Sequence, residues 1–330
     1  MIMTTTTKML EPITSKLECI AVSQASLNNL TLRHSKHFHP IDQPHHDHQS
    51  SKDSTSIPLL QVQASFFECG GLAIGLCMSH KLADAATMSK FISIWAAIAA
   101  GHEQPAQTQQ LPIVEFNAAS YFPPREHLSA FKSPITISKV PNKCVVKKRY
   151  VFDRTNIEAL REKAVSQSVK RPSRVEAVTV LIWRCAMAAA WDKPTTLLDN
   201  KDAGDSSKKK KKKKSIIIQL VNIRKRGESN GAARFGCSAQ ESSRNNRDED
   251  DEMKLYTCNS WCRFELYDVA DFGWGKPIWI SANDNNSFLL MDTKGGDGIE
   301  ALVTLSEEEK ALLEKDDELL TFATSNPSVS

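Results

Sequence analysis

The sequence lacks the features that mark membrane-spanning, secreted and zinc-stabilised proteins. No stretch approaches the roughly 20 consecutive apolar residues that cross a bilayer, and residues 1–10 are threonine-rich without the apolar run of a secretory signal. The 8 cysteines are scattered, and no two form a C-x-x-C pair. We therefore expect a cytoplasmic protein with no membrane partner, whose thiols are reduced and mostly buried.

The charge balance gives little support for a nucleic-acid-binding face. Residues 208–214 are all lysine, so the formal net charge of +3 leaves the rest of the chain at 3 − 7 = −4. Such a run is typical of a solvated loop that repels itself. No interleaved aromatic residues or nucleic-acid-binding motif accompany it, and we expect no nucleic-acid partner; a nucleic-acid tether is the alternative interpretation.

Residues 1–56 show little hydrophobic periodicity, and we expect this segment to be poorly ordered. Between residues 33 and 54 it concentrates Asp, Gln, Ser and Pro with six of the 9 histidines, at positions 34, 37, 39, 45, 46 and 48. Structural zinc sites usually combine fixed spacing with thiolate ligands. We therefore expect adventitious metal affinity here and no specific metal site.

Order is predicted to begin at residue 57. Apolar residues alternate with polar ones over Leu60–Phe66, as in a half-buried strand, and two glycines at 70–71 supply a turn before a second apolar run, Leu72–Met78. Beyond Asp84 the apolar residues recur at helical spacing until Gly101. The pattern predicts a hairpin followed directly by a helix.

The later elements complete an α/β pattern. Ser173 and Glu176 form a capping box, which predicts a helix over 174–191. A further helix is expected from Ser306 to about residue 322 and another over 155–169, with strands over 144–152, 215–223, 287–291 and 299–305. We predict two domains, each a mixed sheet with flanking helices: 57–201 and 215–330, joined by a crossover loop at 202–214, with 227–252 disordered.

The most informative motif runs from Ser79 to Asp84, where His80 and Asp84 form an H-x-x-x-D. It lies where a predicted strand passes into a predicted helix, so a side chain there is held by two rigid elements and can still face a cleft. An imidazole, with an ordinary pKa of about 6.5, can accept a proton near neutral pH. Two fixed positions in five are a weak signal alone, and a helix-capping or core role is the alternative for His80.

A second motif makes the signal more specific. Asp271, Phe272, Gly273, Trp274 and Gly275 form a run of turn and aromatic residues with a low chance frequency. Together with the H-x-x-x-D, this run resembles the motif pair of the BAHD acyltransferases of plants. The resemblance continues at 66–71, 174–177, 221–226, 260–264 and 290–298, and the wording around His80 is most similar to the vinorine synthase branch.

The resemblance implies a chloramphenicol acetyltransferase-like fold and an acyl-CoA co-substrate. The reaction implied is transfer of an acyl group, most simply acetyl, to a hydroxyl of a plant specialised metabolite such as an alkaloid or terpenoid. His80 matches the general base, and Asp84 matches an aspartate that pairs with an arginine and holds the His80 loop. No bound cofactor or metal is expected, because the thioester is already activated, and a monomer is expected.

The resemblance also assigns roles in the second half of the chain. Asp271–Gly275 match a loop that shapes the coenzyme A channel and the domain packing. Trp261 matches a tryptophan near the reaction centre, whose indole N–H can donate to the developing oxyanion or to the acceptor. Asn259 stands where the family often has threonine, a change that bears on acceptor geometry.

Two departures from the family pattern concern segments that help to wall the acceptor pocket. The family has a structured region ahead of the hairpin, where this chain has unpatterned sequence, and a folded stretch where this chain has a short polar segment between 226 and 259. We therefore expect a chain shortened at its N-terminus and internally. The alternative function is an inactive family member that acts as a binding protein or has no function.

Overall fold

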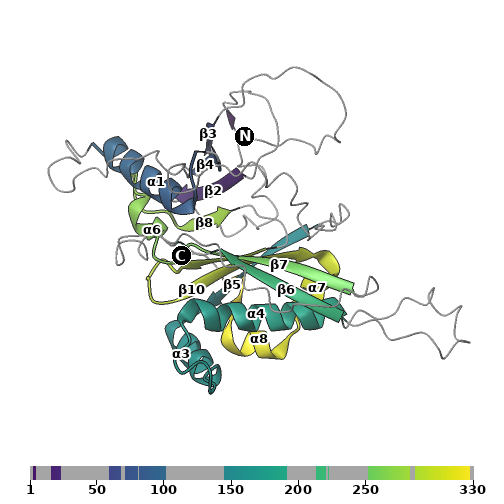
Figure 1. Ribbon diagram of the computed structural model, residues 1–330. Helices are drawn as coiled ribbons and strands as arrows, with labels where there is room; N and C mark the ends of the chain where they lie inside the picture. Colours follow the sequence, from purple (N-terminus) through teal and green to yellow (C-terminus); the bar gives the residue numbers. More distant parts are fainter. Residues whose placement is uncertain are drawn as a thin grey trace, which may run out of the picture.

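The computed structural model describes residues 3–4, 16–23, 59–67, 71–80, 82–101, 145–191, 213–220, 222, 252–282 and 287–327. They form two β-sheets, with helices against each (Figure 1). None of the helices in these ranges has the length and apolar character needed to span a bilayer.

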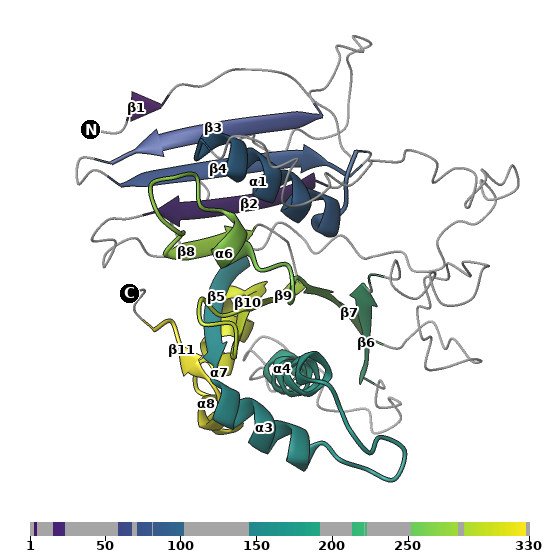
Figure 2. The same cartoon turned by 90° about the vertical axis from the view of Figure 1, so that its left-hand side faces the viewer.

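The five-stranded sheet has the order β1-β3-β4-β2-β8, and every described pairing in it is antiparallel. Its strands are β1 (Met3–Thr4), β2 (Lys16–Ser23), β3 (Leu60–Phe66), β4 (Leu72–Ser79) and β8 (Trp279–Ala282). The predicted hairpin is confirmed as β3 and β4. Helix α1 (Ala85–Ala99) follows it and lies against this sheet (Figure 2).

The six-stranded sheet is mixed and has the order β11-β5-β10-β9-β7-β6. Its strands are β5 (Val145–Phe152), β6 (Lys213–Leu220), β7 (Glu252–Ser260), β9 (Ser287–Asp292), β10 (Ile299–Ser306) and β11 (Thr324–Ser325). The β6–β7 and β7–β9 pairs are parallel, whereas the others are antiparallel. Only this second sheet therefore shows the mixed character that was expected of both.

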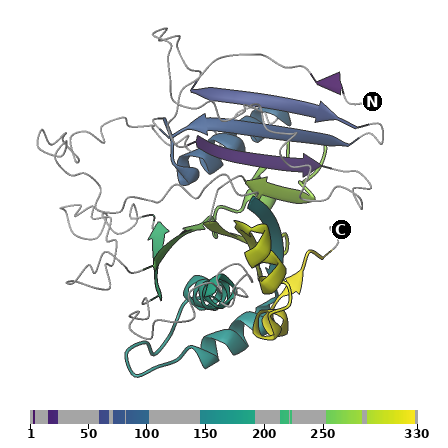
Figure 3. The same cartoon turned by 90° about the vertical axis from the view of Figure 1, so that its right-hand side faces the viewer.

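Helices cover one face of the six-stranded sheet (Figure 3). They are α3 (Arg154–Lys163), α4 (Arg174–Trp191), α7 (Glu307–Leu313) and α8 (Asp317–Phe322). Between them and the sheet lies a core that includes the fully buried Phe288 and Leu290 of β9. The alternate residues Leu289 and Met291 face the other way and are also buried. Strand β9 is thus apolar on both faces, as in the interior of a layered protein.

A second core joins the two sheets. Leu76 and Met78 of β4, Met88 of α1 and Leu302 of β10 pack together in it, with the short helix α6 (Leu266–Val269). The two sheets therefore share one apolar interior, which fixes the strand-to-helix junction at His80 relative to the six-stranded sheet.

The helix predictions succeed where local signals are strong. The Ser173 N–H donates to Glu176 Oε2 at 2.7 Å, and the Glu176 N–H donates to Ser173 Oγ at 3.2 Å, which is the predicted capping box. Helix α3 ends at Lys163, earlier than predicted. The predicted final helix is divided into α7 and α8, because Asp316 Oδ1 accepts from Leu319 N–H and starts a new helix.

The segment before residue 57 differs from its expected disorder at two places. It contains β1 and also β2, which pairs with β4 on one side and β8 on the other. A weakly periodic segment is ordered here by pairing along both edges, a tertiary effect that overrides local pattern. The rest of residues 1–56 lies outside the described residues, as do residues 227–251 of the predicted disordered segment 227–252. The last residue of that segment, Glu252, is ordered as the first residue of β7.

The two sheets do not follow the predicted division of the chain at 202–214. Strand β5 precedes this segment and lies in the six-stranded sheet, while β8 follows it and lies in the five-stranded sheet. Strand β6 also begins at Lys213, inside the predicted loop. The domain boundary itself stays a prediction.

Candidate active site

His80 directly follows β4, and its side chain is exposed. A tight turn holds it, since the Leu82 and Ala83 N–H groups both donate to the Ser79 carbonyl, at 2.9 and 3.2 Å. The His80 ring Nδ1 lies 3.2 Å from the Ala83 carbonyl oxygen. A carbonyl can only accept, so this contact favours the tautomer protonated at Nδ1 and leaves the Nε2 lone pair free to take a proton.

Asp84 is the N-cap of α1. Its Oδ1 accepts from the Thr87 N–H at 3.0 Å and from the Thr87 hydroxyl at 2.8 Å. An N-cap aspartate satisfies helix N–H groups that have no partner within the helix. Asp84 thus sets where α1 begins, and thereby fixes the turn that carries His80.

The 271–275 loop packs on the opposite end of α1. Phe272 meets Trp95 edge to face at a ring separation of 4.8 Å and stacks on Trp274 at 5.5 Å. Because a helix rises about 1.5 Å per residue, Trp95 lies roughly 16 Å along the axis from Asp84. The two motifs recognised in the sequence therefore sit at the two ends of one helix.

Asp271 shapes this loop from within. Its Oδ1 accepts from the N–H groups of Gly273 and Gly275, at 2.9 and 3.1 Å. Both glycines have positive φ, and a Cβ on Gly273 would lie 3.1 Å from the Ala100 Cα. Glycine at 273 thus permits both the backbone turn and close contact with the end of α1.

Trp261 is buried and begins a strained turn. Arg263 and Glu265 have φ values of 70° and 51°, in the left-handed region that non-glycine residues rarely adopt. Strain of this kind typically costs about 1–3 kcal/mol per residue and requires support from the surrounding structure. The turn begins at a fixed point, because the Trp261 N–H donates to the Leu290 carbonyl at 2.7 Å.

Two side chains from other elements hold the turn. The Asp292 carboxylate accepts from the Arg263 N–H, and the Ser89 hydroxyl of α1 donates to the Phe264 carbonyl at 3.1 Å. Asp292 is itself held by Arg174, whose Nη2 lies 3.0 Å from Asp292 Oδ1. The helix that starts beside His80 is thus tied to the turn that starts at Trp261.

A pocket of about 260 Å³ adjoins this turn. Trp261 and Met291 line it together with a charged rim that includes Arg174, Arg263 and Asp292. His80 is not among its lining residues. Of the predicted site residues, the structure places Trp261 in this pocket, His80 at the β4–α1 junction and the 271–275 loop at the far end of α1.

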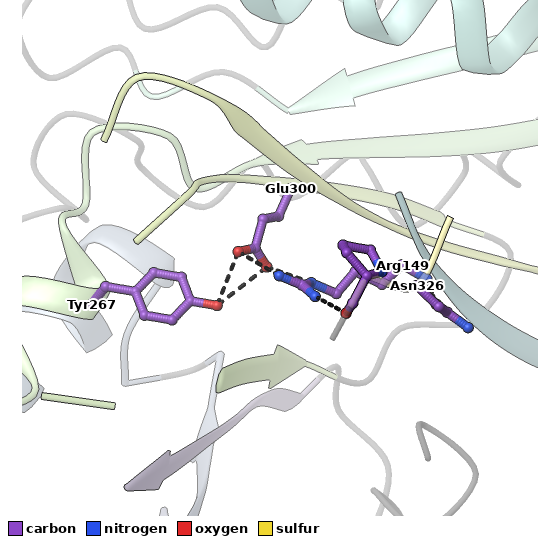
Figure 4. A network of polar contacts seen from close by, with 5 residues as sticks. Arg149, Tyr267, Glu300 and Asn326 are labelled. Atoms are coloured by element: carbon purple, nitrogen blue, oxygen red, sulfur yellow. Dashed lines mark hydrogen bonds and ion pairs between the residues drawn. The ribbon is translucent and has the colours of Figure 1, made fainter. Parts of the chain in front are cut away.

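A buried polar network lies between the sheets (Figure 4). Arg149 donates from Nε and Nη2 to the two Glu300 carboxylate oxygens, at 2.9 and 3.0 Å, and the Tyr267 hydroxyl lies 3.2 Å from both oxygens. Burial lowers the pKa of Arg149, but the hydrogen bond and charge of Glu300 outweigh it, so that this pKa is raised. The network links β5, β10 and α6, and is structural.

The thiols near the site are poor nucleophiles. Burial raises the pKa values of Cys258 and Cys262 to about 11, so both stay protonated at neutral pH. Within the described ranges, no group of three or more His, Cys, Asp and Glu side chains is placed to hold a metal ion.

Comparison with known proteins gives the family. A family model described as the Transferase family matches residues 22–236 and 236–320. BAHD acyltransferase BIA1 of Arabidopsis thaliana is 31% identical, over 82% of this chain and 70% of the relative. The chain belongs to the BAHD acyltransferase family. Salutaridinol 7-O-acetyltransferase of Papaver somniferum is 32% identical, over 79% of this chain and 70% of its own length.

Solved structures of similar fold confirm the predicted fold class. Vinorine synthase matches with a TM-score of 0.59 at 28% identity, over 89% of this chain and 72% of that one. The F. graminearum TRI101 protein, solved with coenzyme A and deoxynivalenol, matches with a TM-score of 0.57 over 81% of this chain and 70% of that one; at 15% identity the likeness concerns the fold alone. This BAHD chain has the chloramphenicol acetyltransferase-like α/β fold.

Proposed function

We propose that this acyltransferase moves an acyl group, most simply acetyl, from acyl-CoA to a hydroxyl of a small plant metabolite such as an alkaloid or terpenoid. The observation that carries the proposal is the His80 ring, whose Nδ1 lies 3.2 Å from the Ala83 carbonyl and whose Nε2 is left to act as a base. Support for the acceptor class comes from relatives named as alkaloid acetyltransferases, among them stemmadenine O-acetyltransferase of Catharanthus roseus.

In the proposed reaction His80 Nε2 takes the proton of the acceptor hydroxyl as its oxygen attacks the thioester carbon. The tetrahedral intermediate then expels the coenzyme A thiolate, and the proton on Nε2 is returned to that sulfur. The products are the acyl ester and free coenzyme A, and His80 is regenerated without a covalent enzyme intermediate. Positioned general-base catalysis of this kind is typically worth about 10²–10⁴ in rate.

Trp261 is proposed to assist from the second half of the chain. Its indole N–H is a donor only, and it suits either the oxyanion that develops on the thioester carbonyl or the acceptor. Asp84 is proposed to orient the His80 turn, and Asp271–Gly275 to hold α1 and bound the coenzyme A channel. We further propose that the protein works as a cytoplasmic monomer without a bound metal or organic cofactor.

The test is turnover of acetyl-CoA with a panel of hydroxylated alkaloids and terpenoids, followed as free thiol release and as ester by mass spectrometry. We expect His80→Ala to lower kcat by about 10²–10⁴ while coenzyme A still binds. The control is Glu318→Gln, which removes the ion pairs of α8 to Lys163 of α3 and Arg184 of α4, away from the His80 turn. Equal turnover by His80→Ala would remove His80 from the mechanism.

The same assay separates the proposal from an inactive family member. Measurable coenzyme A affinity with no ester from any acceptor would favour a binding protein. The observation that favours this alternative is that His80 is not among the residues that line the described pocket. Ester formation that depends on His80 would exclude the alternative of an inactive family member.

A further inference from the structure

We infer that Asp292 is a positioning residue, which holds Arg263 in its left-handed conformation and thereby fixes the Trp261 indole. The inference rests on the proposed function, because it concerns Trp261 in acyl transfer. It adds to that function a residue outside both motifs. Asp292 ends β9, and no role in the reaction follows from its place in the sequence alone.

The backbone geometry shows why the turn needs a clamp. Arg263 and Glu265 both have positive φ, within four residues of Trp261. Neither residue is glycine, asparagine or aspartate, the types that adopt this region most readily. Without outside contacts the turn would relax toward negative φ and carry the adjoining Trp261 with it.

Asp292 is the charged group placed to prevent that relaxation. One carboxylate oxygen accepts from the Arg263 N–H, and the other lies 3.0 Å from Arg174 Nη2. Arg174 is anchored in turn, because its Nη1 donates to the Asp297 carbonyl at 3.0 Å. Arg174, at the start of α4, therefore holds the Asp292 carboxylate in a fixed position, from which it contacts the turn.

The Ser89 hydroxyl secures the next residue of the turn. Ser89 is 8% exposed and donates to the Phe264 carbonyl from the buried face of α1. The peptide unit before Arg263 and the one after Phe264 are therefore tied to separate elements. Asp292 fixes the turn to the six-stranded sheet, and Ser89 fixes it to the helix that begins next to His80.

Glycine provides a sharp test, since it adopts positive φ without the penalty of a Cβ. We expect Asp292→Ala to lower kcat about 10²-fold, as a small misplacement can, with little change in the KM for acetyl-CoA. Adding Arg263→Gly should restore at least half of that loss on a logarithmic scale. The double variant is compared with Arg263→Gly alone, which shows any loss caused by removal of the arginine side chain itself. Glu318→Gln should stay close to wild type.

A series at position 263 tests the clamp without removing Asp292, in case Asp292→Ala does not fold. Arg263 is exposed, so these variants should fold. Tolerance of the left-handed region falls from glycine through asparagine to the β-branched valine. The expected order of kcat is therefore Arg263→Gly at or above Arg263→Asn, with Arg263→Val lowest.

Two outcomes would overturn the inference. One is failure of Arg263→Gly to restore any activity to Asp292→Ala. The other is a loss in Arg263→Gly alone as large as in Asp292→Ala, which would assign the role to the arginine side chain. If the wild-type protein forms no ester, the proposed function fails, and amide hydrogen exchange over 261–266 still decides the clamp: exchange should rise in Asp292→Ala and stay at the wild-type level in Arg263→Gly.

Discussion

The Arg149 guanidinium and the Glu300 carboxylate meet through two parallel hydrogen bonds, at 2.9 and 3.0 Å, with only 11% and 3% of their side chains exposed. Tyr267 adds a third donor to the same carboxylate. Such a pair has lost most of its hydration, so each charge depends on the other. The pair stabilises the fold only while both partners are present, so removal of one partner should lower the free energy of unfolding.

We therefore expect Glu300→Gln to lower the free energy of unfolding by about 3–5 kcal/mol, because it leaves the Arg149 cation buried without a counter-charge. Urea denaturation followed by circular dichroism measures this. The matched control is Glu158→Gln, which breaks the more exposed ion pair to Arg161 and should change little. The double variant Arg149→Met with Glu300→Leu should be more stable than Glu300→Gln, and the opposite order would contradict the argument.

Substitutions at Asp84 separate its capping role from its charge. Asp84→Ala should destabilise the protein by about 1 kcal/mol through loss of the cap, whereas Asp84→Ser keeps a capping oxygen and should restore that stability. We expect kcat to be low in both, because the role proposed for Asp84, to orient the His80 turn, depends on its charge. Thermal unfolding and acetyl transfer are measured on the same samples, and recovery of kcat in Asp84→Ser would show that the cap alone suffices.

The two glycines of the 271–275 loop form a natural pair for comparison. Both have positive φ, so alanine at either should cost about 1–3 kcal/mol in backbone strain. Only at Gly273 would the new Cβ also press on Ala100, at 3.1 Å, while no atom of the described residues lies within 4 Å of a Cβ at Gly275. Gly273→Ala should therefore lower the unfolding temperature more than Gly275→Ala, and equal effects would mean that the contact with α1 is unimportant.

The capping box at the start of α4 predicts a pH dependence. The Ser173 N–H donates to Glu176 and holds the pKa of that carboxyl below its usual range. A lowered folded-state pKa stabilises the protein above the unfolded-state value of about 4.3, and the stabilisation is lost as the pH falls through the folded-state value. Unfolding temperatures of wild type and Glu176→Gln should thus converge as the pH is lowered from 5 to 3, and a constant gap would exclude this carboxylate as the cause.

Local patterns in the sequence were sufficient for much of the fold. Ser173 and Glu176 identified the start of α4 because a capping box is complete within four residues. The hairpin of β3 and β4 and the strand β10 were likewise predictable, because alternation and flanking glycines are local signals. The final helix was predicted as one element, since Asp316 resembles any other polar residue until its cap is seen.

Strands defined by distant partners escaped prediction. Strand β7 pairs in parallel with β6 and β9, and it begins at Glu252, the last residue of an acidic run that points to disorder. Strand β2 is ordered by β4 and β8, whose segments lie far along the chain. In both cases the strand is stabilised by its pairing partners, and the sequence of the strand itself does not indicate which segments those partners are.

The site was predictable to the level of motifs and no further. His80, Asp84 and Trp261 stand in recognisable sequence contexts, and the structure gives each a defined place. The contact of Asp292 with Arg263 joins residues 29 apart, and that of Arg149 with Glu300 joins residues 151 apart. Such contacts depend on strand register and crossing, which the sequence alone does not specify.

The contacts between α1 and the 271–275 loop predict where second-site suppressor mutations should occur. His80 stands before the first turn of α1, while Phe272 and Gly273 contact its last turns through Trp95 and Ala100. A damaging substitution in the 271–275 loop should therefore be suppressed by second-site changes on α1, some 175 residues earlier in the chain. Suppressor selection for restored acetyl transfer should yield changes at Trp95 or Ala100 in preference to changes at the loop's neighbours in sequence.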